Sequence, residues 1–264
     1  MSQAEIQGAL WGAKAQDWAE VQEPAWTPIF ERGLNLAGLR AGESLLDIGC
    51  GAGGALALAR RRGADVAGID ASANLVAIAR RRLPVARIEI GDMEALPFAA
   101  ASFDIVTGFN SFQFAANAVV SLAQAARVCR KGGTVFVLAW GKAEDCELVT
   151  MIMRHVMVLL PPERHAAGAP VADCASIAAA LRAGGIEPIA AGEFEAELVY
   201  PDADAALRAL LSAGIAVRAA QIVNEERVSN AIRARLGAAA RYDGSIEFRN
   251  RFCWVKGKPT SVAS

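Results

Sequence analysis

The ten residues 45–54 read LLDIGCGAGG, an apolar segment that runs directly into a glycine-rich turn. Gly49, Gly51 and Gly54 satisfy the G-x-G-x-x-G pattern of dinucleotide-binding proteins, in which glycines let the backbone approach a pyrophosphate closely. Asp47, however, stands two residues before the first glycine. The stretch therefore predicts a strand followed by a ligand-binding turn, and it leaves open whether the ligand is an anion or a cation.

On both sides of this turn, short apolar segments alternate with segments of helical spacing. Strands are expected at residues 44–48, 65–70, 86–90, 103–109, 134–140, 186–199 and 246–256. Helices are expected at residues 53–62, 73–82, 117–130, 148–160, 173–183, 202–213 and 216–237. This alternation predicts an α/β protein with a mostly parallel sheet covered by helices on both faces.

The composition narrows the class of protein. Hydrophobic residues make up 54% of the 264 residues and the net charge is −1, so we expect a large buried core and no general electrostatic attraction to nucleic acid or anionic membranes. The five cysteines form no C-x-x-C pair, which indicates neither a zinc site nor a disulfide framework. The first residues lack the basic and apolar regions of a signal peptide. We therefore expect a cytoplasmic monomer or homodimer without membrane insertion.

The charge of Asp47 decides between two cofactor classes. Asp70 ends the next expected strand and could bind a ribose in either class. A pyrophosphate beside the glycine turn prefers helix amides and positive charge, so a carboxylate there would repel it. S-adenosylmethionine (SAM) instead offers an ammonium and a sulfonium group, which a carboxylate attracts. A nicotinamide-dependent oxidoreductase stays open, although neither Tyr200 nor Tyr242 has a lysine four residues on.

Three motifs between residues 44 and 140 agree with the SAM interpretation. LDIGCGAG at 46–53, GDMEALPF at 91–98 and RVCRKGG at 127–133 resemble the glycine-rich motif, the adenine-binding turn and the turn before the fifth strand of class I SAM-dependent methyltransferases. The branch resembled is the small-molecule group that includes quinone and sterol methyltransferases. The resemblance implies a Rossmann-like, doubly wound, mostly parallel seven-stranded sheet with an antiparallel final strand and a helical cap.

The resemblance also implies roles in cofactor binding. Asp47 would contact the methionyl ammonium, while Gly49 and Gly51 would let the backbone approach the methionine portion. Asp70 would accept hydrogen bonds from the ribose hydroxyls, and Ala71 would pack on the adenine.

Four further residues complete the expected cofactor contacts. Asp92 would accept a hydrogen bond from the adenine amino group, and Met93 would contact the adenine ring. The backbone at Phe109 would pass the sulfonium. Trp18 would contact the cofactor from N-terminal helices that close over it.

Substrate-binding residues are expected at the carboxyl edge of the sheet and in its caps, and these are Trp11, Asn110, Phe112, Gln113, Met153 and His155. Many members of the family carry a His-His pair where this chain has Gln113 and Phe114, so any role of those histidines is absent. His155 and His165 are the candidates for a catalytic base. A base is not required, because methyl transfer depends mainly on alignment and the exclusion of water.

The sequence thus predicts a single methyltransferase domain over residues 1–264. Its expected parts are an N-terminal helical cap at 2–40, a SAM-binding core at 44–140, a substrate-cap insertion at 143–170 and a C-terminal completion of the sheet at 171–264. The expected reaction moves a methyl group from SAM to an O, N or C atom of a small, partly aromatic or heterocyclic metabolite. S-adenosylhomocysteine would be the product, and neither a metal nor a nucleic-acid partner is expected. An NAD(P)-dependent oxidoreductase and a non-catalytic SAM-binding protein are the alternatives.

Overall fold

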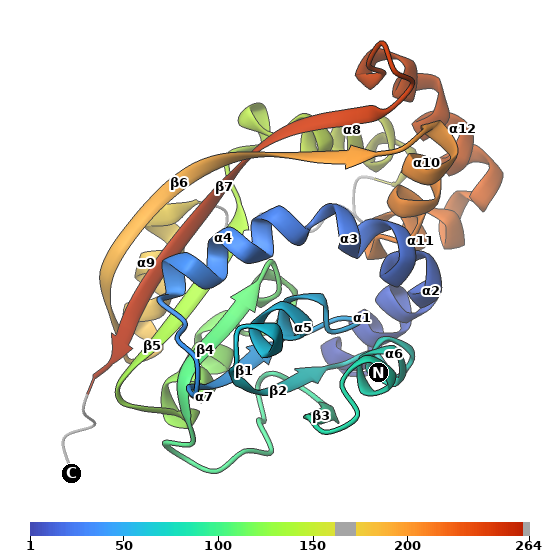
Figure 1. The fold of residues 1–264 in the computed structure, drawn as a ribbon. Helices are drawn as coiled ribbons and strands as arrows, with labels where there is room; N and C mark the ends of the chain where they lie inside the picture. The colour runs from blue at the N-terminus through green and yellow to red at the C-terminus, as the bar shows by residue number, and fades with distance from the viewer. Residues whose placement is uncertain (162–172, 261–264) are drawn as a thin grey trace.

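The computed structural model describes residues 1–161 and 173–260, which form one seven-stranded sheet flanked by helices (Figure 1). The strands lie in the order β3-β2-β1-β4-β5-β7-β6. Their bounds are Ser44–Ile48 (β1), Asp65–Asp70 (β2), Arg87–Ile90 (β3), Phe103–Phe109 (β4), Cys129–Trp140 (β5), Ile186–Tyr200 (β6) and Ile246–Pro259 (β7). β7 pairs antiparallel with both of its neighbours, β5 and β6, and all other strand pairs are parallel. The predicted mostly parallel seven-stranded sheet with an antiparallel final strand is therefore confirmed.

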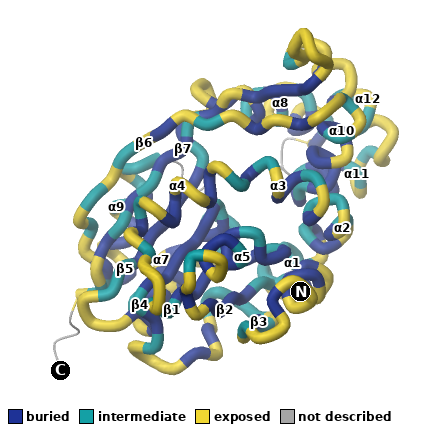
Figure 2. The backbone as a smooth tube through the Cα atoms, viewed as in Figure 1, coloured by how far each residue is buried: buried dark blue, intermediate teal, exposed yellow. Residues whose placement is uncertain are grey.

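Alternation along the strands divides the core between the two faces of the sheet. Leu45 and Ile105 belong to one buried cluster, while their neighbours Leu46 and Val106 belong to the other. The helices α4 (Thr27–Ala37), α5 (Gly54–Arg61) and α6 (Ala73–Arg82) cover the first face, and α7 (Ala118–Val128) and α9 (Cys174–Ala183) cover the second. The central strands β1, β2 and β4 are accordingly almost continuously buried, whereas buried and exposed residues alternate along the edge strand β6 (Figure 2).

The N-terminal cap consists of short helices rather than long ones. Its elements are α1 (Gln3–Gly12), α2 (Ala15–Asp17), a π-helical turn (Trp18–Gln22), α3 (Glu23–Ala25) and α4. Pro24 and Pro28 each stand in the first turn of a helix, where the missing N–H costs nothing. The two prolines therefore set the starts of α3 and α4.

The C-terminal cap consists of α8 (Glu147–His155), α10 (Ala203–Leu211), α11 (Gly214–Val223) and α12 (Glu225–Leu236), at the end of the sheet where β6 finishes (Figure 1). The prediction of one helix over 216–237 is wrong. Asn224 has a φ of +82° and interrupts it, and its side chain accepts a hydrogen bond from the Arg227 N–H at the start of α12. The expected helix over 148–160 ends at His155 and is followed by a 3-10 turn, Met157–Leu159.

None of the described helices is by itself long and apolar enough to span a membrane, and α10 and α11 reach that measure only together, across an 81° bend.

Candidate functional site

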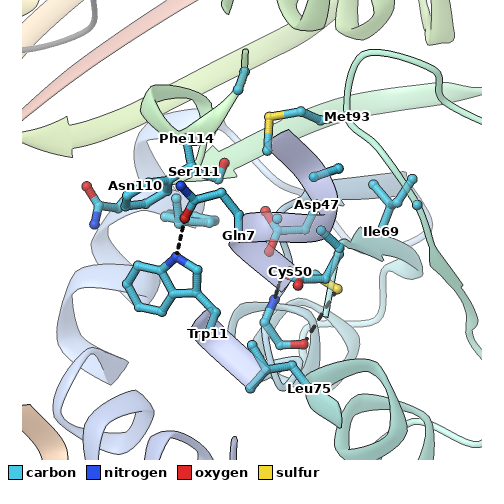
Figure 3. Close-up of a pocket in the computed structure, with 18 of the residues that line it drawn as sticks. Gln7, Trp11, Asp47, Cys50, Ile69, Leu75, Met93, Asn110, Ser111 and Phe114 are labelled. Atoms are coloured by element: carbon cyan, nitrogen blue, oxygen red, sulfur yellow. Dashed lines mark hydrogen bonds between the residues drawn. The ribbon is translucent and has the colours of Figure 1, made fainter. Parts of the chain in front are cut away.

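A pocket opens at the carboxyl ends of β1, β2 and β4, beneath α1 (Figure 3). Such an edge is the usual ligand site of an open α/β sheet. The structure brings together at this pocket all nine residues predicted as cofactor contacts, and these are Trp18, Asp47, Gly49, Gly51, Asp70, Ala71, Asp92, Met93 and Phe109.

The glycine turn after β1 forms the floor of the pocket. Gly49 and Gly51 have φ values of +76° and +56°, a region that side chains disfavour. A Cβ on Gly49 would lie only 2.4 Å from the Cβ of Ser111. The N–H groups of Gly49 and Cys50 both donate to the Ile69 carbonyl oxygen, at 2.8 and 3.0 Å, and so tie the turn to the end of β2.

Asp47 places a carboxyl group beside this turn. Its side chain is buried, and Oδ1 accepts a hydrogen bond of 2.7 Å from Thr107 Oγ1. Burial raises the pKa of Asp47 to about 7, against the lowering effect of Thr107, and the nearby acids Asp70 and Glu23 raise it further. A cation in the pocket would therefore favour the ionised form of Asp47.

Asp70 holds a second carboxyl group at the end of β2. Its Oδ2 accepts a hydrogen bond of 2.9 Å from the Gly51 N–H, and its Oδ1 accepts one of 2.8 Å from the Ser72 N–H. Burial raises the pKa of Asp70 in spite of these two bonds. The two N–H donors fix the orientation of the carboxylate at the rim of the glycine turn.

Glu23 is a further acid at the pocket, beside Asp47, Asp70 and Asp92, and sequence reasoning missed it. Its side chain is only 4% exposed and lies at the start of α5, where it accepts backbone hydrogen bonds from Ala52 and Gly54 and pairs with Arg82. Burial raises the pKa of Glu23 even though Arg82 acts in the opposite direction. Nothing in the sequence links positions 23 and 82, so no motif could have found the pair.

The pocket is therefore acidic. Glu23 and Asp47 are buried beside it and Asp70 is partly buried, whereas no lysine, arginine or histidine belongs to its lining among the described residues. Arg82 forms an ion pair with Glu23 but does not itself line the pocket. Because buried charges need partners, this arrangement favours a ligand that carries positive charge.

The helix α1 covers the pocket and contributes Gln3, Ala4, Gln7 and Trp11 to its lining. Trp11 Nε1 donates to Gln7 Oε1 at 3.1 Å (Figure 3), and the Trp11 ring meets the Trp18 ring edge-on at 5.0 Å. Trp18 Nε1 is buried and finds no hydrogen-bond partner within the described part of the chain. A Cβ on Gly51 would lie 3.4 Å from that nitrogen, so the unpaired N–H is held close to the glycine turn.

The predicted substrate residues divide into two groups. Trp11 and Asn110 line the pocket, and Gln113 Nε2 donates to Asn110 Oδ1 at 2.5 Å from outside it. Phe112 packs under Gly108 in the cluster on the opposite face of the sheet. Asn110 has a φ of +54°, an uncommon conformation that often marks functional sites.

The predicted residues of α8 are not part of the pocket. Met153 is half exposed on that helix, and His155 forms its last residue. Burial lowers the pKa of His155, and Arg235 and Arg154 add to this effect. His165 lies outside the described residues.

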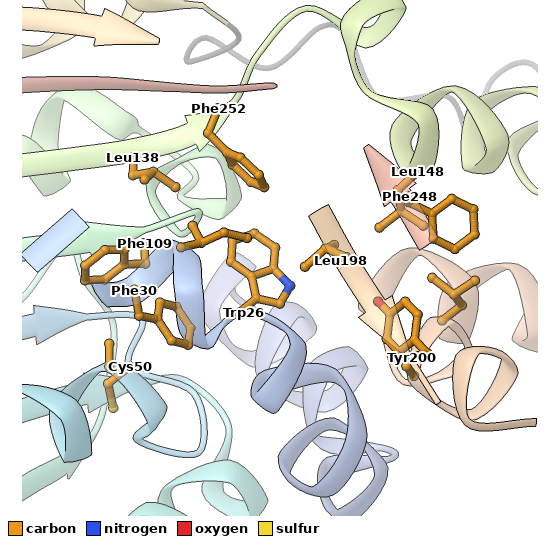
Figure 4. Close-up of a cluster of buried hydrophobic side chains, with 14 of the residues drawn as sticks. Trp26, Phe30, Cys50, Phe109, Leu138, Leu148, Leu198, Tyr200, Phe248 and Phe252 are labelled. Atoms are coloured by element: carbon orange, nitrogen blue, oxygen red, sulfur yellow. The ribbon is translucent and has the colours of Figure 1, made fainter. Parts of the chain in front are cut away.

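An aromatic wall closes the inner side of the pocket (Figure 4). Trp26 and Phe30 lie with ring centroids 5.9 Å apart, and Phe30 meets Phe109 at 5.3 Å. Trp26 also contacts Trp140 and Phe252, so the wall continues into the main buried cluster. The sequence predicted a helical cap over residues 2–40 but no place in the pocket for Trp26 or Phe30.

Comparison with known proteins gives three kinds of match. The family model for a methyltransferase domain matches residues 46–137. The 27-O-demethylrifamycin SV methyltransferase of Amycolatopsis mediterranei is 30% identical over 204 residues, which cover 70% of this chain and 71% of that protein. The demethylmenaquinone methyltransferase of Beutenbergia cavernae is 38% identical over 104 residues, 39% of this chain and 43% of the relative.

Other curated relatives match over a smaller share of their length. Proteins of Mycobacterium bovis and Mycobacterium tuberculosis are 33% identical to this chain over 128 residues. The match covers 47% of this chain and 47% of each relative, so the chain spans about half of their length.

Among solved structures, the cyclase SpnF superposes with a TM-score of 0.57 at 20% identity, over 89% of this chain and 81% of that one. The geranyl diphosphate C-methyltransferase of Streptomyces coelicolor A3(2) superposes with a TM-score of 0.51 at 18% identity, over 90% and 79%. At these identities the structures establish the shared fold.

Proposed function

Since the chain belongs to the class I SAM-dependent methyltransferases, we propose that it transfers a methyl group from SAM to an O, N or C atom of a small, partly aromatic or heterocyclic metabolite. One observation carries the proposal. The buried carboxyl groups of Glu23 and Asp47 and the partly buried one of Asp70 surround the glycine turn, and the described lining of the pocket holds no cationic side chain. The ammonium and sulfonium groups of SAM would supply the positive charge that this arrangement lacks.

The same geometry supports a separate role for each cofactor-binding residue. Asp47 would hold the methionyl ammonium, and Gly49 and Gly51 would admit the methionine portion against the backbone. Asp70, already oriented by two N–H donors, would accept from the ribose hydroxyls, while Ala71 would pack on the adenine.

The remaining cofactor contacts lie on three separate segments of the pocket wall. Asp92 and Met93 would bind the adenine amino group and ring, and Phe109 would border the sulfonium. Trp18 would cover the methionine portion from the N-terminal cap, with its unpaired N–H available to an acceptor on the ligand.

SAM would supply the activated methyl group, and the protein would contribute alignment and exclusion of water. The helix α1 covers the pocket, and Trp26, Phe30 and Phe109 form its apolar inner wall. This wall supports an acceptor with an apolar or aromatic surface. No histidine lines the described pocket, so a reaction that relies on alignment fits better than one that relies on a histidine base.

We assign substrate contact to Trp11 and Asn110, with Gln113 holding the Asn110 side chain in place. Phe112, Met153 and His155 would act on the substrate only indirectly, because they lie outside the pocket lining. The net charge of −1 supports a reaction that involves neither nucleic acid nor an anionic membrane, and we also propose that the protein is a cytoplasmic monomer or homodimer.

The experiment that tests this function measures S-adenosylhomocysteine by mass spectrometry. The protein is incubated with SAM and a panel of aromatic and heterocyclic compounds that carry hydroxyl, amine or carbon nucleophiles. We expect at least one acceptor to give product above the acceptor-free background, and to give none with the Asp70→Ala variant. SAM binding without any turnover across the panel would favour the non-catalytic alternative, and the cyclase of the same fold shows that the fold alone does not decide.

A further inference from the structure

A cluster of potential metal ligands lies on the face of the sheet that α9 covers. Cys174 comes from α9, Glu193 from β6 and Cys253 from β7, and the two sulfur atoms and a carboxylate oxygen all lie within 4.8 Å of one another. Glu193 and Cys253 are direct partners in the antiparallel β6–β7 register, so their side chains share one face. None of the three lines the cofactor pocket.

The sulfur atoms of the cluster contact the Glu193 carboxylate and a backbone carbonyl oxygen. Cys253 Sγ lies 3.5 Å from Glu193 Oε1, and Cys174 Sγ lies 3.2 Å from the Gly192 carbonyl oxygen. Cys253 is fully buried, Cys174 is partly buried and Glu193 is exposed. The cluster therefore has a closed sulfur side and an open carboxylate side through which an ion can enter.

We propose that Cys174, Cys253 and Glu193 bind a thiophilic divalent cation of the Zn²⁺ type. Zinc binds cysteine sulfur at about 2.3 Å and carboxylate oxygen at about 2.0–2.2 Å, and a site with three protein ligands keeps water in the fourth position. Binding forms two metal–sulfur bonds and one metal–oxygen bond, and the two thiol protons pass to solvent. The observed sulfur–oxygen separation of 3.5 Å already suits two ligands of one tetrahedral ion.

The charges around the cluster agree with a bound cation. Two thiolates and one carboxylate leave a single negative charge on a complex with a divalent ion. Arg251 lies beside it, with Nη1 3.7 Å from Glu193 Oε2, and can balance that charge.

The ion would join the first turn of α9 to both strands at the β6–β7 edge. Sequence reasoning predicted no metal site, because the two cysteines are far apart in the chain and form no C-x-x-C pair. Their proximity depends on the β6–β7 register and on the packing of α9 against these strands. The site lies apart from the cofactor pocket and does not depend on the proposed methyl transfer.

The test titrates the full, reduced chain with Zn²⁺ by calorimetry and with Cd²⁺ by the ultraviolet charge-transfer band of cadmium thiolates. We expect one ion per chain, proton release and a raised melting temperature. Cys174→Ser and Cys253→Ser should abolish the cadmium band, and Glu193→Gln should weaken binding roughly tenfold or more.

Two variants serve as matched controls. Glu195→Gln removes the other β6 acid that pairs with Arg251, and Cys129→Ser removes a buried cysteine outside the cluster, so both should bind as the wild type does. Absence of metal uptake would overturn the proposal, as would uptake that survives both cluster cysteine variants. A Cys174–Cys253 disulfide found by peptide mapping in protein that takes up no metal after reduction would overturn it as well.

Discussion

Asp70 ends β2 at the edge of the sheet where the pocket lies, so its side chain is placed to bind a ligand. Its carboxylate accepts hydrogen bonds from the N–H groups of Gly51 and Ser72, so it is oriented before any ligand arrives. A ligand whose two hydroxyl groups donate hydrogen bonds to this pre-oriented carboxylate gains more binding free energy than it would with a mobile carboxylate.

We predict that Asp70→Ala weakens SAM binding by about a hundredfold, since two hydrogen bonds to a charged group are lost at roughly 1.5 kcal/mol each or more. Calorimetric titration measures the effect. Asp65→Ala, at the exposed start of the same strand, is the matched control and should bind SAM normally. An unchanged dissociation constant for Asp70→Ala would remove Asp70 from the site.

Asp47 makes a prediction about pH. Its pKa is raised to about 7, and a cationic ligand binds its ionised form. SAM affinity should therefore fall as the pH drops from 8 to 6, by about tenfold, because the proton must first leave Asp47. Asp47→Asn should bind SAM more weakly at pH 8 and lose most of this pH dependence. Wild-type affinity that is independent of pH over this range would contradict the assignment.

The same substitution should act in the opposite direction on stability. A raised carboxyl pKa means that the folded chain holds a proton that the unfolded chain releases between about pH 4 and 7, so stability falls as the pH rises through that range. Asp47→Asn keeps an acceptor for Thr107 and removes the buried charge. We predict a gain on the order of 1–4 kcal/mol for the ligand-free protein at pH 8, measured by urea unfolding. A loss of stability would show that the charge is compensated.

At this scale the sequence predicted part of the site. The residues at or just after the carboxyl ends of strands, such as Asp47, Asp70 and Asp92, could be placed because parallel strands bring these ends to one edge. Glu23 and Trp26 could not be placed, because their positions depend on how the N-terminal cap packs on the core. His155 and Met153 lie away from the pocket because α8 ends in the C-terminal cap.

Among the elements, α1 determines how closely the pocket is covered. A Cβ on Gly8 would lie 2.4 Å from the Ala71 carbonyl oxygen, and one on Gly12 would lie 2.6 Å from Ser72 Oγ. The helix can rest on the end of β2 only because these two positions lack side chains. Farther along the cap, Arg82 joins the π-helical turn to the glycine turn by donating to the carbonyl oxygens of Ala19 and Ala52.

We predict that Gly8→Ala lifts α1 away from Ala71 and weakens SAM binding roughly tenfold while the fold is retained. The measurement is calorimetric titration together with circular dichroism. Ala9→Ser on the exposed face of the same helix controls for the substitution itself. If Gly8→Ala binds SAM as tightly as the wild type, α1 does not cover the ligand.

The elements that the sequence predicted best are those with a simple period. The strands β1, β2 and β4 were found within their observed bounds, since each is a short apolar segment between turns. The break at Asn224 was missed, because an asparagine inside a polar helical pattern gives no warning that its φ will be positive.

For the whole molecule, the main buried cluster joins parts that are distant in sequence. Trp26 of the N-terminal cap, Phe136 of β5 and Ile232 of α12 all belong to it. This continuity supports the proposal of a single domain.

We therefore predict one cooperative unfolding transition in urea, with coincident curves from tryptophan fluorescence and far-ultraviolet circular dichroism. SAM should move both curves to higher urea concentration by the same amount. Two separated transitions would instead indicate caps that fold independently of the sheet.

The mostly parallel sheet covered by helices was predictable from the alternation of strands and helices, and the resemblance added the seven strands and the antiparallel last one. The contact between the N-terminal and C-terminal caps was not, since pairs such as Arg208 with Asp17 join surfaces that no local pattern relates.

The most direct test of the central claim is a calorimetric titration of the protein at pH 8 with SAM, S-adenosylhomocysteine, NADH and NADPH. The acidic pocket predicts one binding site with roughly micromolar affinity for the first two ligands and no binding of the last two. Binding of NADH or NADPH without binding of SAM would contradict the account.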